Sequence, residues 1–282
     1  MPLVTSEKML LDAQKGGYAI GAFNVENMEM IMAVISAAEK TRAPVMLQTT
    51  PSTVRYAGLD LFFANVNAAA QNSNIPIALH LDHGSSFELA MQAIRAGYTS
   101  IMIDGSQLDF AENIALSKRV ADVARACGLP VEAELGKVGG KEDDLDCVAD
   151  TNTNPAEAKD FIERTGITSL AVAIGTAHGF YEGTPVLDKE RLSEIRGVTT
   201  IPLVLHGASG LSDEDVSDCI KRGICKVNFA TELRVAFTDG IKEVLAEKSS
   251  TFDPKPLGNA GMKKVEELVM NRIKVCGSNG KA

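Results

Sequence analysis

The sequence lacks several features that mark membrane and nucleic-acid-binding proteins. No apolar run approaches the roughly 20 residues that a transmembrane helix needs. Acidic residues outnumber basic ones by 37 to 28, and the formal net charge is −9. The chain therefore has no basic excess to attract nucleic acid or anionic lipid, and we expect neither partner. Acidity does not exclude a small phosphorylated substrate, which needs only a local pocket of donors.

The cysteines form neither a disulfide framework nor a paired Cys-x-x-Cys motif. Their number is odd and they lie in different segments of the chain: Cys127, Cys147, Cys219, Cys225 and Cys276. This usage is typical of a reducing compartment. The first residues also lack the basic and apolar regions of a secretory signal. We therefore expect a cytoplasmic protein.

Short runs rich in valine, isoleucine and leucine recur along the whole chain. The first half of each run consists almost entirely of apolar residues, which is typical of a strand buried on both faces of a parallel sheet. The segments between them space their apolar residues three and four apart and carry cap residues, so they predict helices. The eight predicted strands are 18–25, 44–50, 76–82, 99–105, 130–136, 169–179, 201–209 and 224–230.

Eight strand–helix units in 282 residues predict an α/β fold, the (β/α)8 TIM barrel. No proline-rich or low-complexity linker divides the chain. We therefore expect one domain over residues 1–282, with a C-terminal helical extension from about residue 252. An open doubly wound sheet is the alternative. The count of eight and the lack of a glycine-rich dinucleotide motif after the first strand argue against it.

Every predicted strand ends at a polar or ionisable residue. In a TIM barrel these strand ends meet at the face that carries the chemistry, so we predict an active site there. The residues in question are Asn24, Thr49, Thr50, Asp82, His83, Asp104, Glu134, His178, His206 and Asn228.

Three of the four histidines, His83, His178 and His206, are among these strand ends. Taken singly, a histidine is more often a hydrogen-bonded structural residue than a metal ligand. Three imidazoles from separate strands, with a fourth position open to substrate, instead predict catalytic zinc. Other divalent ions such as cobalt suit the same ligands. We interpret His80 as structural or as a supporting residue.

Small residues follow the last two predicted strands, in HGASG (206–210) and NFAT (228–231). Backbone N–H groups can approach a ligand closely there, at the position where TIM barrels commonly hold phosphate. We expect Gly207, Ser209 and Thr231 to be donors. The charged, glycine-containing segment 134–146 predicts a lid that carries Glu142 over the site.

With these residues assembled, the chain resembles the class II, metal-dependent ketose-bisphosphate aldolases. It is most similar to the tagatose-bisphosphate branch, which is close to fructose-bisphosphate aldolase. The resemblance extends over essentially the whole chain. It rests on motifs that occur in order, including AFNV, HLDHGSSFE, SIMIDGS, VEAELGKVGGKEDD, LAVAIGTAHGFY, PLVLHGASGL and KVNFATEL.

The resemblance implies a lyase that reversibly cleaves a ketose 1,6-bisphosphate to dihydroxyacetone phosphate and glyceraldehyde 3-phosphate, with tagatose slightly ahead of fructose. It implies one Zn²⁺ per subunit and a monovalent cation, Na⁺ or K⁺, beside the phosphate. It also implies a homodimer or homotetramer and, as in some tagatose-branch members, a stabilising partner subunit.

The resemblance also implies a role for each matching residue. Asp82 would be the acid/base at the cleaved carbon, Glu142 would exchange a proton with the three-carbon product, and Asn228 would help to hold the enediolate. His83, His178 and His206 would bind zinc, and Asp104 and Glu134 would support them or offer an alternate metal position. Substrate and phosphate contacts would come from Asn24, Thr50, Gly179, Gly207, Ser209, Ala230, Thr231 and Lys255.

Two of these positions bear on the sugar. Ala230 is as in tagatose-type enzymes, whereas Lys255 stands where many relatives place an arginine that reaches the distal phosphate, often across a subunit boundary. Lysine keeps the charge but loses the planar guanidinium fork. A class II aldolase for a sugar without the second phosphate therefore stays open, as does fructose-bisphosphate aldolase proper.

Other classes of function also stay open. Lys226 lies two residues before Asn228, on the same strand face, where it could form a Schiff base without metal. A metal-dependent sugar isomerase or epimerase could use a similar metal with two carboxylates. The chain could also be a non-catalytic partner subunit, although such a subunit has no need of costly polar strand ends.

Overall fold

The structure is a computed structural model, and it describes residues 3–142, 145–147, 151–181 and 183–282. Eight parallel strands close into a barrel in the order β1-β11-β10-β8-β5-β4-β3-β2. Each predicted apolar run contains most of one barrel strand, so the TIM-barrel prediction is confirmed and the open doubly wound sheet is wrong. The strands are β1 (Ile20–Asn24), β2 (Val45–Thr49), β3 (Ile77–Gly84), β4 (Ser100–Ile103), β5 (Val131–Leu135), β8 (Ser169–Val172), β10 (Leu203–Leu205) and β11 (Ile224–Phe229).

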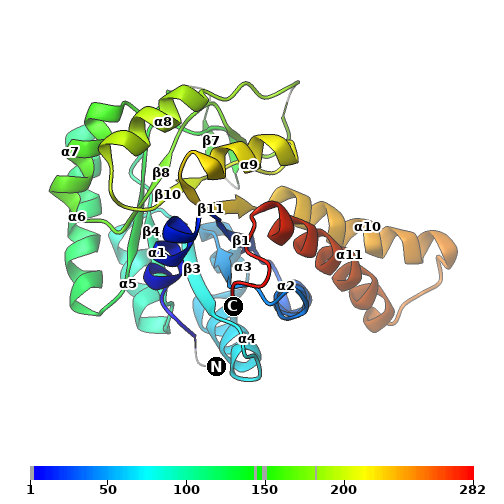
Figure 1. Ribbon diagram of the computed structural model, residues 1–282. Coiled ribbons are helices and arrows are strands. Elements are labelled where there is room, and N and C mark those ends of the chain that lie inside the picture. The colour runs from blue at the N-terminus through cyan, green and yellow to red at the C-terminus, as the bar shows by residue number, and fades with distance from the viewer. Residues whose placement is uncertain (1–2, 143–144, 148–150, 182) are drawn as a thin grey trace.

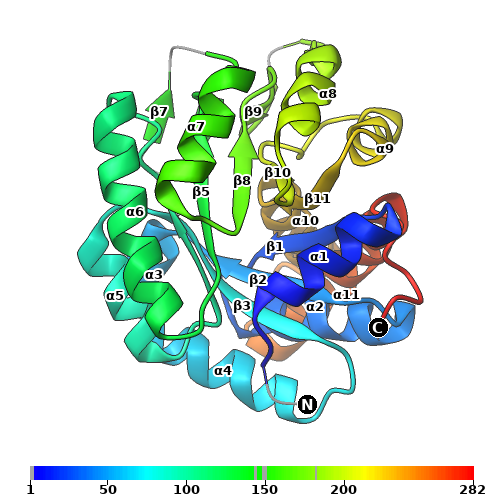
Figure 2. The ribbon, with the colours of Figure 1, turned by 60° about the vertical axis from the view of Figure 1, so that its left-hand side comes forward.

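Helices surround this barrel, as Figures 1 and 2 show from two sides. Asn27, Ser86 and Asp109 cap three of them by accepting hydrogen bonds from first-turn N–H groups. The helices are α1 (Ser6–Gly16), α2 (Met28–Thr41), α3 (Pro51–Ala57), α4 (Leu59–Gln71), α5 (Phe87–Ala96), α6 (Phe110–Ala126), α7 (Pro155–Thr165), α8 (Lys189–Val198), α9 (Asp213–Lys221), α10 (Thr231–Glu247) and α11 (Pro254–Val275).

The barrel strands separate apolar from polar side chains by their alternation. On β3, Leu79 and Leu81 belong to the large apolar cluster that includes helix residues, whereas His80 and Asp82 face the barrel interior. Met9 and its neighbours on α1 pack in a second cluster with residues near the strand starts. Helix α1 therefore closes the end of the barrel opposite the strand ends, and polar side chains fill the interior between them.

Helices α10 and α11 pack along each other and project from the barrel as an arm, seen at the right of Figure 1. Their close approach depends on small residues: a Cβ on Gly240 would lie 2.5 Å from the carbonyl oxygen of Ala260. Helix α11 begins at Pro254, near the predicted start of the C-terminal extension. Its first turn lies at the tip of the arm, next to the exposed Phe252.

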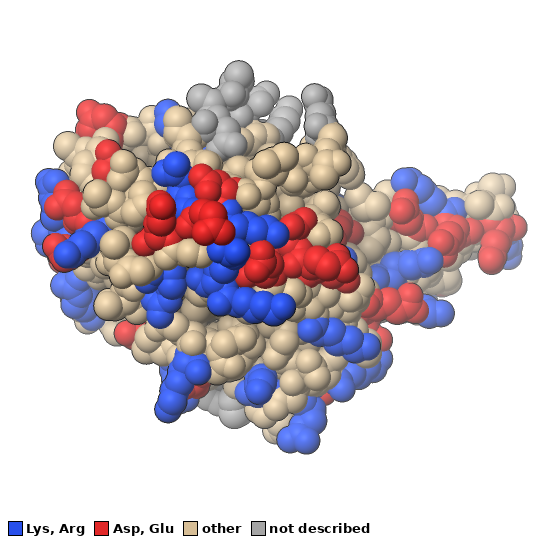
Figure 3. All heavy atoms as spheres, turned by 45° about the horizontal axis from the view of Figure 1, so that its top comes forward, with Lys and Arg blue, Asp and Glu red and all other residues tan. Residues whose placement is uncertain are grey.

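The surface charge and the apolar character of the helices can be compared with the sequence. On the face seen in Figure 3, lysine and arginine are interspersed with aspartate and glutamate, so this face offers no continuous basic surface for nucleic acid. Among the described residues, no helix has both the length and the apolar character needed to cross a bilayer.

The described thiols differ in accessibility, which gives a test of the packing. Burial raises the pKa of Cys219 and Cys225 to about 11 and that of Cys276 to about 12, whereas Cys127 is exposed. Because the thiolate is the reactive form, we expect iodoacetamide at mildly alkaline pH to alkylate Cys127 well before the other three. Peptide mass spectrometry over a time course measures this order. Equal rates in folded protein would contradict the packing.

Candidate active site

Three histidines meet at the C-terminal end of the barrel. His83 is on β3, His178 ends the short strand β9 (Ala177–His178) after β8, and His206 follows β10. One ring nitrogen from each lies within 4.8 Å of the others, and Nε2 of His83 is 3.0 Å from Nδ1 of His206. His83 and His206 are buried, and His178 is half-buried. The structure thus brings together the three imidazoles that the sequence singled out.

Carboxylates hold two of these rings from behind. Asp104 Oδ2 is 2.8 Å from Nδ1 of His83, and Glu132 Oε1 is 2.9 Å from Nε2 of His206. Burial opposes ionisation of Asp104, but the hydrogen bond and charge of His83 and the hydrogen bonds from Ser106 together outweigh burial and hold the pKa of Asp104 well below its usual range. For Glu132, burial is likewise outweighed by the Lys226 ammonium together with His206 and His80, so the pKa of Glu132 is also well below the usual range. Burial lowers the pKa of His206, which favours the neutral ring.

The donor set fits zinc. Three imidazoles from three separate strand ends suit a catalytic Zn²⁺ with one position open to substrate, and carboxylates behind the rings are the usual supporting partners. A second group of donor atoms, from His83, Asp104 and Glu134, also lies within 4.8 Å. Glu134 Oε2 is 3.4 Å from Nδ1 of His206, so Asp104 and Glu134 both border the histidine cluster.

Asp82 is fully buried next to this cluster, and three amides hold its carboxylate. Asn24 and Gln48 donate to Oδ2 at 2.9 and 3.1 Å, and Asn228 donates to Oδ1 at 3.1 Å. Asn24, Asp82 and Asn228 were predicted to share the site, and the structure brings them together. Gln48 was missed, although an amide in the middle of the apolar run VMLQT was a signal.

A pocket opens beside His178 between the loops that follow the last strands. Ser209 Oγ accepts from the N–H of Ala230 at 3.3 Å, and Ala230 precedes α10 without a capping side chain. Gly207 has φ of 66°, and a Cβ there would lie 2.6 Å from the carbonyl oxygen of Ala177, so only glycine fits. The residues that line this pocket are His178, Gly179, Gly207, Ser209, Asn228, Ala230, Thr231 and Arg234.

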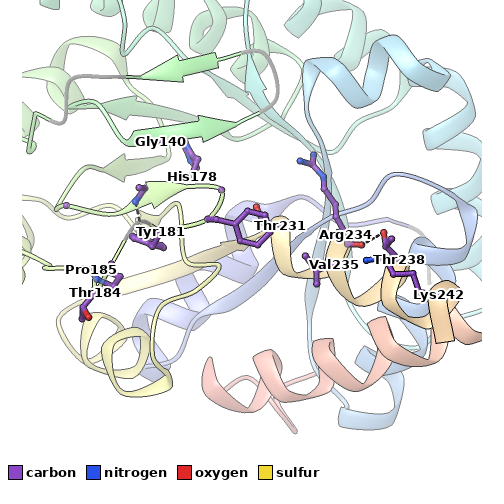
Figure 4. Close-up of a pocket in the computed structure, with 15 residues that line it drawn as sticks. Gly140, His178, Tyr181, Thr184, Pro185, Thr231, Arg234, Val235, Thr238 and Lys242 are labelled. Carbon is purple, nitrogen blue, oxygen red and sulfur yellow. Dashed lines mark hydrogen bonds between the residues drawn. The ribbon is translucent and has the colours of Figure 1, made fainter. Parts of the chain in front are cut away.

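A larger cavity of about 1010 Å³ continues from this pocket along α10 (Figure 4). Arg234 borders both spaces and was missed by the sequence reasoning. Its Nη2 lies 2.6 Å from Oε1 of Glu26, and Oε2 of Glu26 accepts from Thr53 at 2.7 Å. The hydroxyl oxygens of Thr53 and Thr50 lie 3.1 Å apart, so these polar contacts link the predicted substrate contact Thr50 to Arg234.

The predicted lid takes up regular structure. Strand β6 (Gly139–Glu142) pairs antiparallel with β7 (Leu145–Cys147) and parallel with β9. Gly140 lies opposite His178 with φ of 84°, and a Cβ there would clash with the His178 carbonyl. The backbone of Glu142 ends β6, but its side chain is outside the described part of the structure, so the role of Glu142 stays a prediction.

Two predicted residues lie apart from the cluster. The side chain of Lys255 is 82% exposed at the tip of the arm, where its Nζ is 3.4 Å from Asp253. Thr49 faces outward, where its hydroxyl lies 2.8 Å from that of Tyr98.

Lys226, the residue considered for a Schiff base, is fully buried. Its Nζ lies 2.9 Å from Oε2 of Glu132, so it is ion-paired instead of poised for Schiff-base chemistry.

Residues 4–281 match the family model described as fructose-bisphosphate aldolase class-II. The chain belongs to this family. It is 38% identical to the YdjI aldolase from Escherichia coli K12 over 99% of both chains, with a TM-score of 0.88. It is 33% identical to a candidate fructose-1,6-bisphosphate aldolase from Coccidioides immitis, over 97% of this chain and 96% of that one, with a TM-score of 0.89.

At lower identity the fold alone is shared. The chain matches fructose-bisphosphate aldolase (Fba) from Campylobacter jejuni at 22% identity, over 100% of this chain and 97% of that one, with a TM-score of 0.85. As a class II aldolase the protein is a lyase that acts on a phosphorylated sugar, and its family generally uses a divalent metal. The isomerase and non-catalytic alternatives are therefore wrong.

Gln48 offers a test of how this class II aldolase holds its buried carboxylate. Gln48→Met removes one donor to Asp82, and we expect a loss of about 1–3 kcal/mol of folding free energy, measured by denaturant unfolding. Gln48→Glu instead puts a second carboxyl about where the amide stands 3.1 Å from Asp82. Like charge raises the folded-state pKa there, so its destabilisation should be largest at neutral pH and shrink as the pH falls. A pH-independent loss in Gln48→Glu would count against this arrangement.

Proposed function

We propose that the protein catalyses reversible, zinc-dependent aldol cleavage of a ketose 1,6-bisphosphate to dihydroxyacetone phosphate and glyceraldehyde 3-phosphate. Tagatose is slightly favoured over fructose, because Ala230 is as in tagatose-type enzymes. The observation that carries the proposal is the position of Asp82. Its carboxylate is held by Asn24, Gln48 and Asn228, and it precedes in sequence one of three converging histidines.

His83, His178 and His206 would bind the zinc ion. When bound, Zn²⁺ acts as a Lewis acid that polarises the substrate carbonyl and stabilises the negative charge that develops as the carbon–carbon bond breaks. Asp104 and Glu132 keep two of the imidazoles oriented towards one another. Glu134 lies at the edge of the same group and would support the metal or offer it an alternate position.

Asp82 would accept the proton of the hydroxyl at the carbon that becomes the aldehyde, while the bond to the neighbouring carbon breaks. In the direction of synthesis it would return this proton. Because amides fill both of its oxygens from the side, its carboxylate has a fixed orientation, which general acid–base catalysis needs. Glu142 would give a proton to the three-carbon fragment, and Asn228 would hold that fragment while it is negatively charged.

The phosphate of the dihydroxyacetone half would lie in the pocket beside His178. Gly179, Gly207, Ser209 and Thr231 line this pocket together with Ala230. The start of α10 directs backbone N–H groups there, which favours an anion. A Na⁺ or K⁺ ion would offset part of the phosphate charge. Asn24 and Thr50 would contact the remainder of the sugar from the opposite side of the barrel mouth.

Lys255 would reach the distal phosphate only in a second copy of the chain, because it lies at the tip of the projecting arm. We therefore propose a homodimer or homotetramer. We further propose that this oligomer is cytoplasmic and that a stabilising partner subunit can bind to it. The same position of Lys255 favours a second candidate substrate. A ketose with a single phosphate has no distal phosphate, so it would need neither Lys255 nor any other cation outside the barrel mouth.

Metal removal tests the lyase chemistry. We expect triose phosphate release from tagatose 1,6-bisphosphate to stop when a chelator removes the metal and to return when zinc is added, since the proposed electrophile is the Zn²⁺ ion that the three histidines would hold. Fructose 1,6-bisphosphate, assayed beside it, should give a lower kcat/KM. Cleavage that persists in metal-free protein would contradict the proposal. A monophosphorylated ketose that outperforms both sugars would replace the substrate but keep the mechanism.

Asp82→Asn tests the acid/base assignment. Asparagine keeps the shape but cannot take up the hydroxyl proton, so we expect kcat to fall by about 10²- to 10⁴-fold. Zinc content should stay at the wild-type level, because Asp82 is not one of the three histidines that would hold the metal. Near-normal turnover in a zinc-loaded Asp82→Asn variant would show that another group moves the proton.

A further inference from the structure

A charged pair inside the barrel takes no direct part in the bond cleavage proposed above. Glu132 on β5 and Lys226 on β11 are 2% and 0% exposed, and Nζ of Lys226 lies 2.9 and 3.1 Å from the two carboxylate oxygens of Glu132. A buried ion pair often gives no more stability than well-packed apolar residues of the same volume. Its presence directly behind the histidine cluster therefore calls for a reason other than stability.

Glu132 makes one contact that points to such a reason. Its Oε1 lies 2.9 Å from Nε2 of His206, on the inner side of the ring. The other ring nitrogen, Nδ1, faces outward, 3.0 Å from Nε2 of His83 and 3.4 Å from Oε2 of Glu134. The two nitrogens of His206 thus face different surroundings. The inner one meets a carboxylate, and the outer one meets the group of donor atoms that suits a metal.

A neutral imidazole carries its proton on one nitrogen, and its partner decides which one. A carboxylate at Nε2 accepts a hydrogen bond, so it keeps the proton on Nε2 and leaves the Nδ1 lone pair available. Metal-binding histidines in general are held in this way by a carboxylate or carbonyl behind the ring. The ion pair with Lys226 in turn keeps both Glu132 oxygens in place.

We propose that Glu132 is a positioning residue that fixes His206 as the Nε2–H tautomer and presents its Nδ1 to the metal, with Lys226 as the counter-ion that holds Glu132 there. This inference rests on the metal centre of the proposed function and specifies which nitrogen of His206 is the ligand. His80 borders the same ion pair. Its Nε2 lies 3.9 Å from Glu132, and its Nδ1 lies 2.7 Å from the hydroxyl of Ser100.

The tautomer can be read directly by NMR. The chain has only four histidines, so long-range ¹H–¹⁵N spectra of ¹⁵N-histidine protein are simple enough to assign by substitution. In zinc-loaded wild-type protein we expect the His206 proton on Nε2 and the metal on Nδ1. A His206 ring that carries its proton on Nδ1 and binds zinc through Nε2 would overturn the proposal.

Three variants separate positioning from stability. Glu132→Gln and Lys226→Met each leave one buried charge without its partner, so each should lower the Tm. The double variant Glu132→Gln/Lys226→Met removes both charges, and its Tm should lie closer to that of the wild type. The zinc Kd of the double variant, measured by competition with a chromophoric chelator, should still be about 10- to 100-fold higher than that of the wild type. The neutral amide of the glutamine at position 132 no longer selects the His206 tautomer.

The matched control is Tyr98→Phe, which removes a buried hydroxyl contact with Thr49 on the outer side of the barrel, away from the histidines. It should lower the Tm and leave the zinc Kd unchanged. If the double variant regains zinc affinity together with stability, Glu132 is only structural and the proposal is wrong. If wild-type protein binds no zinc, the metal centre itself is wrong. Zinc binding that is unchanged in Glu132→Gln refutes the positioning role alone.

Discussion

The structure depends on one constraint, that charged and hydrogen-bonding side chains buried inside a closed barrel must satisfy one another. Parallel closure gives the interior no water-exposed edge, and strand alternation points every second side chain into it. Asp82 is held by amides on neighbouring strands, and Glu132 is held by Lys226 and His206. Because each group takes its partners from other strands, the polar interior links β1, β2, β3, β5 and β11 into one network.

Apolar layers surround this network, and their burial offsets the free-energy cost of desolvating its polar groups. Outward-facing strand residues pack under the helices, and α1 seals the opposite end of the barrel with apolar side chains. With burial on both sides, the polar groups keep few alternative partners and therefore adopt defined orientations. In the described part of the chain the same arrangement leaves the strand ends open, where His178 and the loops after β10 and β11 border the two cavities.

The sequence was sufficient for the strands and for which residues gather at their ends, because apolar runs and terminal polar residues are local signals. It could not show which strand supplies each partner. Gln48 contacts Asp82, 34 residues further along the chain, and Glu132 contacts His206, 74 residues further along, only because closure of the barrel points these side chains into the same interior. The pairing of the lid segment with His178, and the position of Lys255 on an arm instead of near the barrel mouth, likewise follow from long-range packing.

The adjacent residues Asp82 and His83 pose the hardest geometric problem, since neighbours on a strand point to opposite faces. Asp82 faces the interior, so a regular strand would turn His83 outward under the helices. Instead, the pairing of β3 with β4 shifts register between Leu81 and Gly84, and His83 has φ of 47°. Such a bulge re-aims one side chain, and Gly84 fits it because a Cβ there would clash with the carbonyl of Met102. The left-handed residue costs about 1–3 kcal/mol, and with it one strand supplies both the proposed acid/base and a proposed metal ligand to the same site.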